Sequence, residues 1–144
     1  FIVGYPGEDE AAFQTLIDFM QKVRFDHVGA FPYSFEPGTP AESLGNPIPE
    51  HVKVERLEYL MQIQGEISFE RNQQFIGNTL DVLVEGVDDE NTISIGRSYR
   101  DAPEIDGLVI IEGLAPIGEM VKVRINSAIT HDLVGELVKP ENKN

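Results

Sequence analysis

Residues 120–126 read Met-Val-Lys-Val-Arg-Ile-Asn, in which apolar and polar side chains alternate without a break from Val121 to Asn126. Successive side chains of a β-strand point to opposite faces, so this stretch predicts a strand with Val121, Val123 and Ile125 turned toward a core. The runs with strand character in this half of the chain are at 80–85, 92–97, 108–112, 119–126 and 133–138. Five short strands predict a small closed barrel of the OB-like kind, with glycines that permit bends at Gly86, Gly96, Gly107, Gly113, Gly118 and Gly135.

Upstream of residue 75 the apolar residues follow a helical period instead, and this change predicts a domain boundary. Short apolar runs at 1–4 and 27–34 have β character. The segment between them places one apolar face on a helix, formed by Phe13, Leu16, Ile17, Met20 and Val23. Acidic residues at 8–10 suit the positive N-terminal end of that helix. Strand, helix and strand in this order predict a βαβ unit with a parallel sheet.

Prolines and glycines crowd residues 36–49, so we expect a loop there, followed by a long helix from Glu50 to about Gln74. The buried side of this helix is predicted to carry Val52, Leu57, Leu60, Met61, Gln64 and Ile67. The solvent side is predicted to carry Lys53, Glu55, Arg56, Glu58 and Glu66. We expect the helix to lie on the sheet and to lead the chain into its second half.

The sequence is strongly acidic, with 25 Asp and Glu against 11 Lys and Arg, and its net charge is −14. Residues 1–71 carry 12 acidic and 5 basic side chains, and residues 72–144 carry 13 and 6, so each half has a net charge of −7. Such a chain repels nucleic-acid phosphates and attracts basic surfaces. Acidity also serves solubility alone, and the composition does not decide between these interpretations.

The sequence has no cysteine, which excludes disulfides, cysteine nucleophiles and cysteine-held iron–sulfur clusters from this segment. His27, His51 and His131 are too far apart in the sequence to indicate a metal site. No phosphate-binding loop, dinucleotide fingerprint or nucleophile elbow occurs, and no apolar run approaches the roughly 20 residues of a membrane helix. We therefore predict no catalytic residue and no metal ligand. The first residues read as the middle of a buried strand, so the chain is expected to begin inside a larger polypeptide.

Three stretches are candidates for ligand contact. Residues 2–8 and 33–40 each run from a strand end into a turn rich in glycine and proline, at the edge where parallel sheets place ligands. Both are also explained as plain connections. Residues 96–107 join two barrel strands and gather arginines, a tyrosine and acids, which suits a recognition surface or an internally paired loop. Composition alone does not choose between these two. The substrate-binding candidates are Arg97, Tyr99, Arg100 and Asp101.

Taken together, these stretches resemble the radical-SAM methylthiotransferases. Residues 1–8 resemble the family's Ile-Val-Gly-Phe-Pro-Gly-Glu strand and turn, with Tyr5 in place of phenylalanine. Residues 33–41 resemble its Tyr-Ser-x-x-x-Gly-Thr-x-Ala segment, and residues 67–73 resemble its Ile-Ser-x-x-x-Asn-Gln exit from the catalytic domain. Gly-Arg-Ser-Tyr-Arg-Asp-Ala-Pro-Glu-Ile-Asp-Gly at 96–107 is similar to the RimO branch and unlike the transfer-RNA-modifying MiaB branch. The resemblance covers essentially the whole chain.

The resemblance implies a fold in two parts. Residues 1–71 would be the α/β remnant of a radical-SAM half-barrel, a partial TIM-like barrel that ends in a long exit helix. Residues 72–140 would be an all-β, five-stranded, OB-like TRAM barrel, and residues 141–144 a tail.

The resemblance also implies a cytoplasmic transferase that attaches a methylthio group to the β-carbon of an aspartate in a small-subunit ribosomal protein. The family uses S-adenosylmethionine and two iron–sulfur clusters of the 4Fe-4S kind, whose cysteines are absent here. This segment is therefore expected to hold no cluster and to be inactive alone. Its implied roles are to complete the cofactor-binding barrel and to bind the protein substrate. The strand that matches the one beside the adenine of the cofactor comprises Ile2, Val3 and Gly4.

Charge and resemblance together predict that the barrel binds a basic ribosomal protein rather than RNA, and that the protein has no membrane partner. Two alternatives are a transfer-RNA methylthiotransferase of the MiaB type and a non-catalytic TRAM-type binding module. The stretch at 96–107 and the acidity disfavour the first. The predicted βαβ unit in residues 1–34 disfavours the second.

Overall fold

The computed structural model describes residues 1–101 and 107–139. The chain divides into two compact units, Phe1–Ile67 and Ser68–Asn144. The predicted tail at 141–144 and the acidic loop residues Glu104 and Asp106 lie outside the described residues.

The first unit begins with a two-stranded parallel ribbon. β1 (Ile2–Val3) pairs with β2 (Phe31–Pro32), so the predicted parallel pairing is confirmed. Both strands are shorter than the apolar runs that predicted them, and β1 ends where Gly4 turns the chain with a φ of 82°. A ribbon of two strands with two helices is too small to define a half-barrel.

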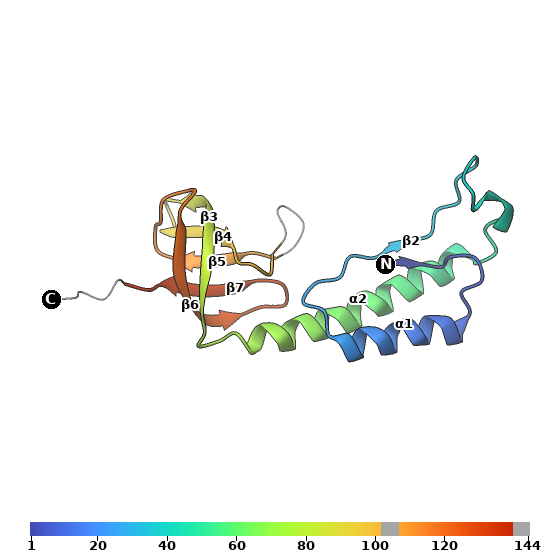
Figure 1. Cartoon of the computed structure of the whole chain (residues 1–144), viewed down its shortest axis with the longest axis horizontal. Coiled ribbons are helices and arrows are strands. Elements are labelled where there is room, and N and C mark those ends of the chain that lie inside the picture. Colours follow the sequence, from blue (N-terminus) through green and yellow to red (C-terminus); the bar gives the residue numbers. More distant parts are fainter. Residues whose placement is uncertain (102–106, 140–144) are drawn as a thin grey trace. The chain divides into compact units, whose positions relative to one another are not determined.

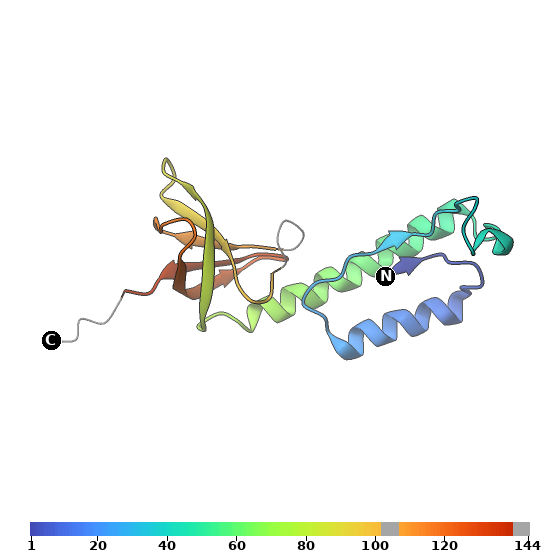
Figure 2. The same ribbon diagram turned by 45° about the horizontal axis from the view of Figure 1, so that its top comes forward.

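α1 (Glu10–Val23) connects the two strands and is capped at both ends. The side chain of Asp9 accepts a hydrogen bond from the Ala12 amide (2.7 Å), and the left-handed Arg24 donates its N–H to the Met20 carbonyl (2.8 Å). Figures 1 and 2 show α1 and α2 (Glu50–Gln73) on the same side of the ribbon. The core of this unit contains Val3, Phe13, Ile17, Met20 and Leu60.

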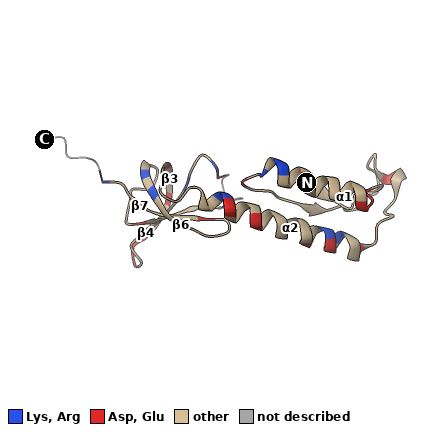
Figure 3. Cartoon of the chain, turned by 90° about the horizontal axis from the view of Figure 1, so that it is seen from below, with Lys and Arg blue, Asp and Glu red and all other residues tan. Residues whose placement is uncertain are grey.

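α2 buries only part of the predicted face, with Leu60, Gln64 and Ile67 inside as predicted. Lys53 and Arg56, predicted to face solvent, are buried, whereas Met61, predicted to be inside, is exposed. The prediction is wrong at the two cations because it sorted side chains by polarity alone, and both cations find polar partners in the turns that follow the strands. Figure 3 marks both acidic and basic positions along the α2 ribbon. The loop before α2 contains a 3-10 helix, η1 (Glu42–Leu44).

The second unit is a closed five-stranded barrel, as the alternating sequence predicts (Figures 1 and 2). Its strands are β3 (Thr79–Asp88), β4 (Ile93–Arg97), β5 (Val109–Glu112), β6 (Met120–Ala128) and β7 (Leu133–Leu137). The spatial order is β3-β4-β5-β7-β6, with β5 and β7 parallel and all other neighbours antiparallel. The helical periodicity of the first unit thus gives way to alternation along the barrel strands, interrupted by register shifts between Val84 and Gly86 and between Ile125 and Ser127.

The inner face of the barrel is apolar, and its tight closure requires glycine at two positions. A Cβ at Gly96 would lie 2.4 Å from the Leu83 carbonyl oxygen, and one at Gly135 would lie 2.4 Å from the Arg124 carbonyl oxygen. Neither contact is possible for a real side chain, so only glycine lets these strands approach. The fully buried core residues are Val82, Val84, Val109, Ile111, Val123, Ile125 and Leu133.

Candidate functional site

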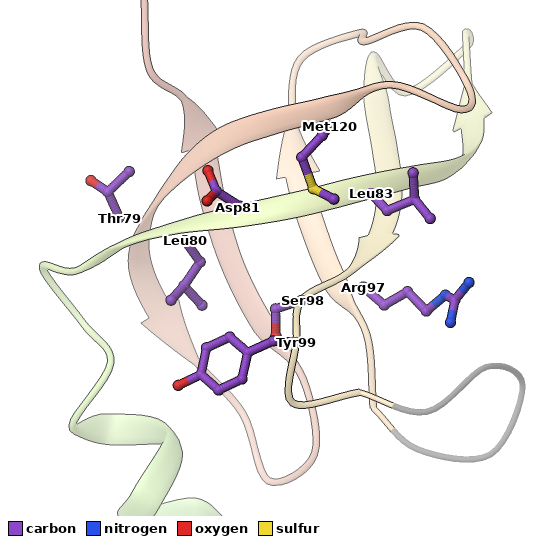
Figure 4. A pocket seen from close by; sticks show the side chains of 8 residues that line it. All are labelled: Thr79, Leu80, Asp81, Leu83, Arg97, Ser98, Tyr99 and Met120. Atoms are coloured by element: carbon purple, nitrogen blue, oxygen red, sulfur yellow. The ribbon is translucent and has the colours of Figure 1, made fainter.

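A surface groove of about 450 Å³ runs along the first half of β3 (Figure 4). The end of β4 and the start of β6 close its sides. Its lining is mainly apolar, and two of its apolar side chains are strongly exposed, Tyr99 at 80% and Met120 at 64%. The lining residues are Thr79, Leu80, Asp81, Leu83, Arg97, Ser98, Tyr99 and Met120. Exposed apolar and aromatic surface beside polar groups is typical of a binding site.

The structure places Arg97 and Tyr99, two of the four predicted substrate-binding residues, in this groove. The Nε of Arg97 donates to the carboxylate of Glu85 on β3, so the cation is locally neutralised. Figure 4 shows Tyr99 and Leu80 on one side of the β3 ribbon and Asp81 and Met120 on the other. The groove therefore combines an aromatic side chain, aliphatic contacts and paired charges.

Arg100 and Asp101, the other two predicted residues, make contacts within the second unit. Arg100 donates through Nη2 to Asn72 Oδ1 (2.9 Å), and its guanidinium carbon lies 4.0 Å from the centre of the Phe75 ring. Asp101 accepts hydrogen bonds from the amide (3.0 Å) and hydroxyl (3.1 Å) of Ser98. These bonds fix the loop that carries Tyr99, so both side chains support the groove wall rather than line it.

Asn72, near the end of α2, joins two barrel loops. Its exposed fraction is 1%, and its Nδ2 donates to the carbonyls of Ile129 (2.9 Å) and Thr130 (3.1 Å) between β6 and β7. Its Oδ1 accepts from Arg100 of the loop after β4. One buried amide therefore satisfies three partners in two loops.

The ribbon of the first unit carries the predicted cofactor strand, Ile2 to Gly4. Val3 is fully buried against the helices, while Ile2 and its β2 partner Phe31 are 59% and 69% exposed on the opposite face. A shallow cavity of about 350 Å³ lies on this face, lined by Ile2, Phe31, Pro32, Tyr33, Ser34, Glu36 and Thr39. Parts of the stretches 2–8 and 33–40 are thus brought together, as parallel pairing of β1 and β2 requires.

Buried polar contacts hold the turns at the end of this ribbon. Gly4 donates its N–H to the carboxylate of Glu8 (3.0 Å), which also accepts from Arg56 (2.8 Å). A Cβ at Gly4 would lie 2.5 Å from the Lys53 side chain, so the turn also needs glycine for space. These contacts bind the turn after β1 to α2.

The ammonium group of Lys53 holds the segment after β2. It donates to the Tyr33 carbonyl (3.0 Å), the Asn46 side chain (2.6 Å) and the Glu50 carboxylate (3.0 Å). Its hydrogen bond to Glu50 is the main cause of a lowered pKa for that carboxyl, with Asn46 acting in the same direction. Among the described residues, no cluster of His, Asp and Glu could hold a metal ion, and no helix is long and apolar enough to cross a membrane.

Residues 76–138, nearly the whole barrel, match the family model of the TRAM domain. The chain is 50% identical over 139 residues to the ribosomal protein uS12 methylthiotransferase RimO of Chloroflexus aurantiacus, covering 94% of this chain. It is 47% identical over 142 residues to the protein of that name from a Roseiflexus species, and 48% identical over 138 residues to the one from Trichormus variabilis. The chain matches the C-terminal part of RimO. It spans about 30% of the length of these RimO relatives.

Sequence reasoning missed the structural roles of Asn72, Lys53 and Arg56. Asn72 does fall in the quoted Asn-Gln of the exit segment, but nothing in that pattern indicates a bond to the barrel. A signal was nevertheless present, because Gln64, Ser68 and Asn72 continue one face of α2 at a spacing of four residues, and all three are buried. A row of polar residues that continues the apolar face of a helix indicates buried side chains that hydrogen-bond to the element packed against that face.

Proposed function

We propose that this chain is the C-terminal portion of a methylthiotransferase that modifies the β-carbon of an aspartate in a small-subunit ribosomal protein. The strongest support is the similarity of nearly the whole chain to RimO relatives, whose names give ribosomal protein uS12 as what they act on. Residues 1–71 complete the cofactor-binding half-barrel, residues 72–140 form the substrate-binding TRAM barrel, and residues 141–144 are a tail. A ribosomal-protein substrate places the enzyme in the cytoplasm.

The electrostatics of the barrel support a basic polypeptide as its partner. Two of its cations are already paired, Arg97 with Glu85 and Lys122 with Asp81 (3.1 Å). The turn after β3 holds three consecutive acids at 88–90. Hydrogen bonds from Asn91 are the chief cause of a lowered pKa for Asp88, which keeps that carboxylate charged. Such a surface repels phosphates and attracts lysine and arginine.

The exposed face of the β1–β2 ribbon fits the adenosine part of S-adenosylmethionine. Ile2 and Phe31 offer apolar contact to a planar ring. The buried Val3 side chain points away from this face, so Val3 and Gly4 would contribute backbone contacts. The cofactor and two 4Fe-4S clusters supply hydrogen abstraction and sulfur insertion in such an enzyme. This sequence has no cysteine, so the cluster ligands would belong to other parts of the enzyme.

A chimeric enzyme tests the proposal. The matching C-terminal part of Chloroflexus aurantiacus RimO is replaced by this chain, and the purified chimera is incubated with uS12, S-adenosylmethionine and a reductant. Mass spectrometry of uS12 should show addition of one methylthio group at an aspartate. The matched control is a chimera that carries only residues 1–71 of this chain and the relative's own barrel.

The outcomes separate the candidate functions. A folded chimera that modifies transfer RNA but not uS12 would favour the MiaB-type alternative. A folded chimera that modifies neither, beside an active control chimera, would refute substrate binding by this barrel and leave a non-catalytic binding module. Modification of uS12 by both chimeras supports the proposal.

A further inference from the structure

The first half of β3 has a partner strand on only one of its edges within the part of the chain that the structure describes. β6 pairs with β3 from Thr79 to Leu83, but pairing with β4 runs only from Leu83 to Asp88. The edge of residues 79–82 opposite to β6 therefore faces the groove beside Ser98 and Tyr99 (Figure 4). Strand edges of this kind are templates for a further strand.

The direction of the backbone N–H and C=O groups along β3 identifies the residues that can hydrogen-bond at that edge. The Asn78 carbonyl accepts from Ile125, and Val84 exchanges hydrogen bonds with Glu119 and Gly118, so the even-numbered residues of β3 point toward β6. N–H and C=O groups of successive residues in a strand point to opposite edges. Thr79 and Asp81 therefore present one donor and one acceptor each to the groove, and both residues are exposed.

The groove beside this edge suits one side chain of an added strand. Leu80 and Leu83 provide aliphatic lining from β3, Met120 provides it from β6, and Tyr99 forms an aromatic wall. A strand that lies along the edge points alternate side chains to opposite faces. One apolar side chain can then enter the groove, while its neighbours project away from it.

We propose that an extended segment of a basic polypeptide adds to the Thr79–Asp81 edge as a short strand and inserts an apolar side chain beside Tyr99. This inference rests on the proposed function, because that function makes a basic protein the partner, and it adds where and how the partner binds. Main-chain hydrogen bonds supply affinity that does not depend on sequence, and the groove together with the acidic residues supplies selectivity. Net negative charge favours a segment rich in lysine or arginine.

The test measures amide hydrogen exchange by NMR in the whole chain, with uS12 and with an acetylated heptapeptide of alternating lysine and valine as probes. Both probes should slow exchange at Thr79 and Asp81. Exchange at Leu80 and Val82, whose amides point toward β6, should stay unchanged. A second heptapeptide with the same side chains, but with N-methyl groups on alternate amides so that one edge cannot donate, should lose at least about fivefold in affinity.

Two variants at residue 79 test whether its backbone N–H contributes to binding. Thr79→Pro removes one edge donor that β6 does not use, at the first residue of a strand, where proline is tolerated. It should weaken uS12 binding by about fivefold, whereas Thr79→Val, which keeps the amide, should bind like the parent chain.

The results distinguish this inference from the proposed function. If uS12 binds but the Thr79 and Asp81 amides exchange as fast as in the free chain, strand addition is wrong and the proposed function stands. If uS12 does not bind at all, both are overturned.

Discussion

Replacing Asn72 by alanine tests how the barrel is held to the end of α2. The substitution removes the donors to the Ile129 and Thr130 carbonyls and one acceptor of Arg100, and Asn72 itself is 1% exposed. A buried polar group left without its partner costs about 1–3 kcal/mol. Water can reach part of the β6–β7 turn, so we expect the second unit to lose about 3 kcal/mol of stability in total.

Hydrogen exchange followed by mass spectrometry measures this loss in the whole chain, because segments from β3 and β6 report opening of the barrel. A loss of about 3 kcal/mol accelerates their exchange by roughly 100-fold. Gln73→Ala is the matched control, since Gln73 also donates to the same turn, at the Ala128 carbonyl (3.2 Å), but is exposed. The reasoning is refuted if Asn72→Ala accelerates exchange no more than Gln73→Ala does.

Three further predictions concern the buried cation, pH and backbone closure. Lys53→Met should destabilise the first unit by about 2 kcal/mol in urea unfolding, because it removes the donor to the Tyr33 carbonyl and to Asn46. The control Lys22→Met, on the outside of α1, should change stability by under about 0.5 kcal/mol. The pKa of Glu50 is lowered in the folded state, so the contribution of this carboxylate to stability is complete above the ordinary glutamate pKa and is lost as the pH falls through the folded value. Acid titration of the first unit should show this loss of stability in the parent chain and lack it in Glu50→Gln. Gly96→Ala should destabilise the barrel by at least about 2 kcal/mol in thermal unfolding, because the added Cβ would meet the Leu83 carbonyl. The control Gly86→Ala, whose Cβ would meet no atom within 4 Å, should cost under about 1 kcal/mol. Equal losses of stability in the two variants would contradict the packing argument.

The barrel was predictable because its sequence signal is local. Val121, Val123 and Ile125 alternate with charged residues, and glycines stand where two strands approach too closely for a side chain. The parallel ribbon was predictable for a similar reason, since a helix between two apolar runs favours parallel pairing. Each signal needs only neighbours in the chain, and the structure confirms both.

The burial of Lys53 and Arg56 was not predictable from helical periodicity. Their partners, Tyr33 and Asn46 for Lys53 and Glu8 for Arg56, lie 7 to 48 residues away in the sequence. Periodicity ranks a residue by its own polarity and contains no information about such partners. A cation therefore reads as solvent-facing until its acceptors are known, which is why the α2 face was assigned wrongly.

The candidate site was predicted only in part, again because the partners of its side chains are distant in the sequence. The sequence singled out 96–107 by composition, but composition does not separate Arg97 and Tyr99, which line the groove, from Arg100, which stacks on Phe75. That distinction depends on where the end of α2 lies on the barrel. Whether these groove residues contact the substrate stays a prediction.

The most direct test of the account is a competition between uS12 and transfer RNA for this chain at physiological salt. An acidic barrel that binds basic protein predicts that uS12 binds at least about tenfold more tightly than transfer RNA, with an affinity that falls as salt rises. Binding of transfer RNA as tight as that of uS12, or tighter, would contradict it.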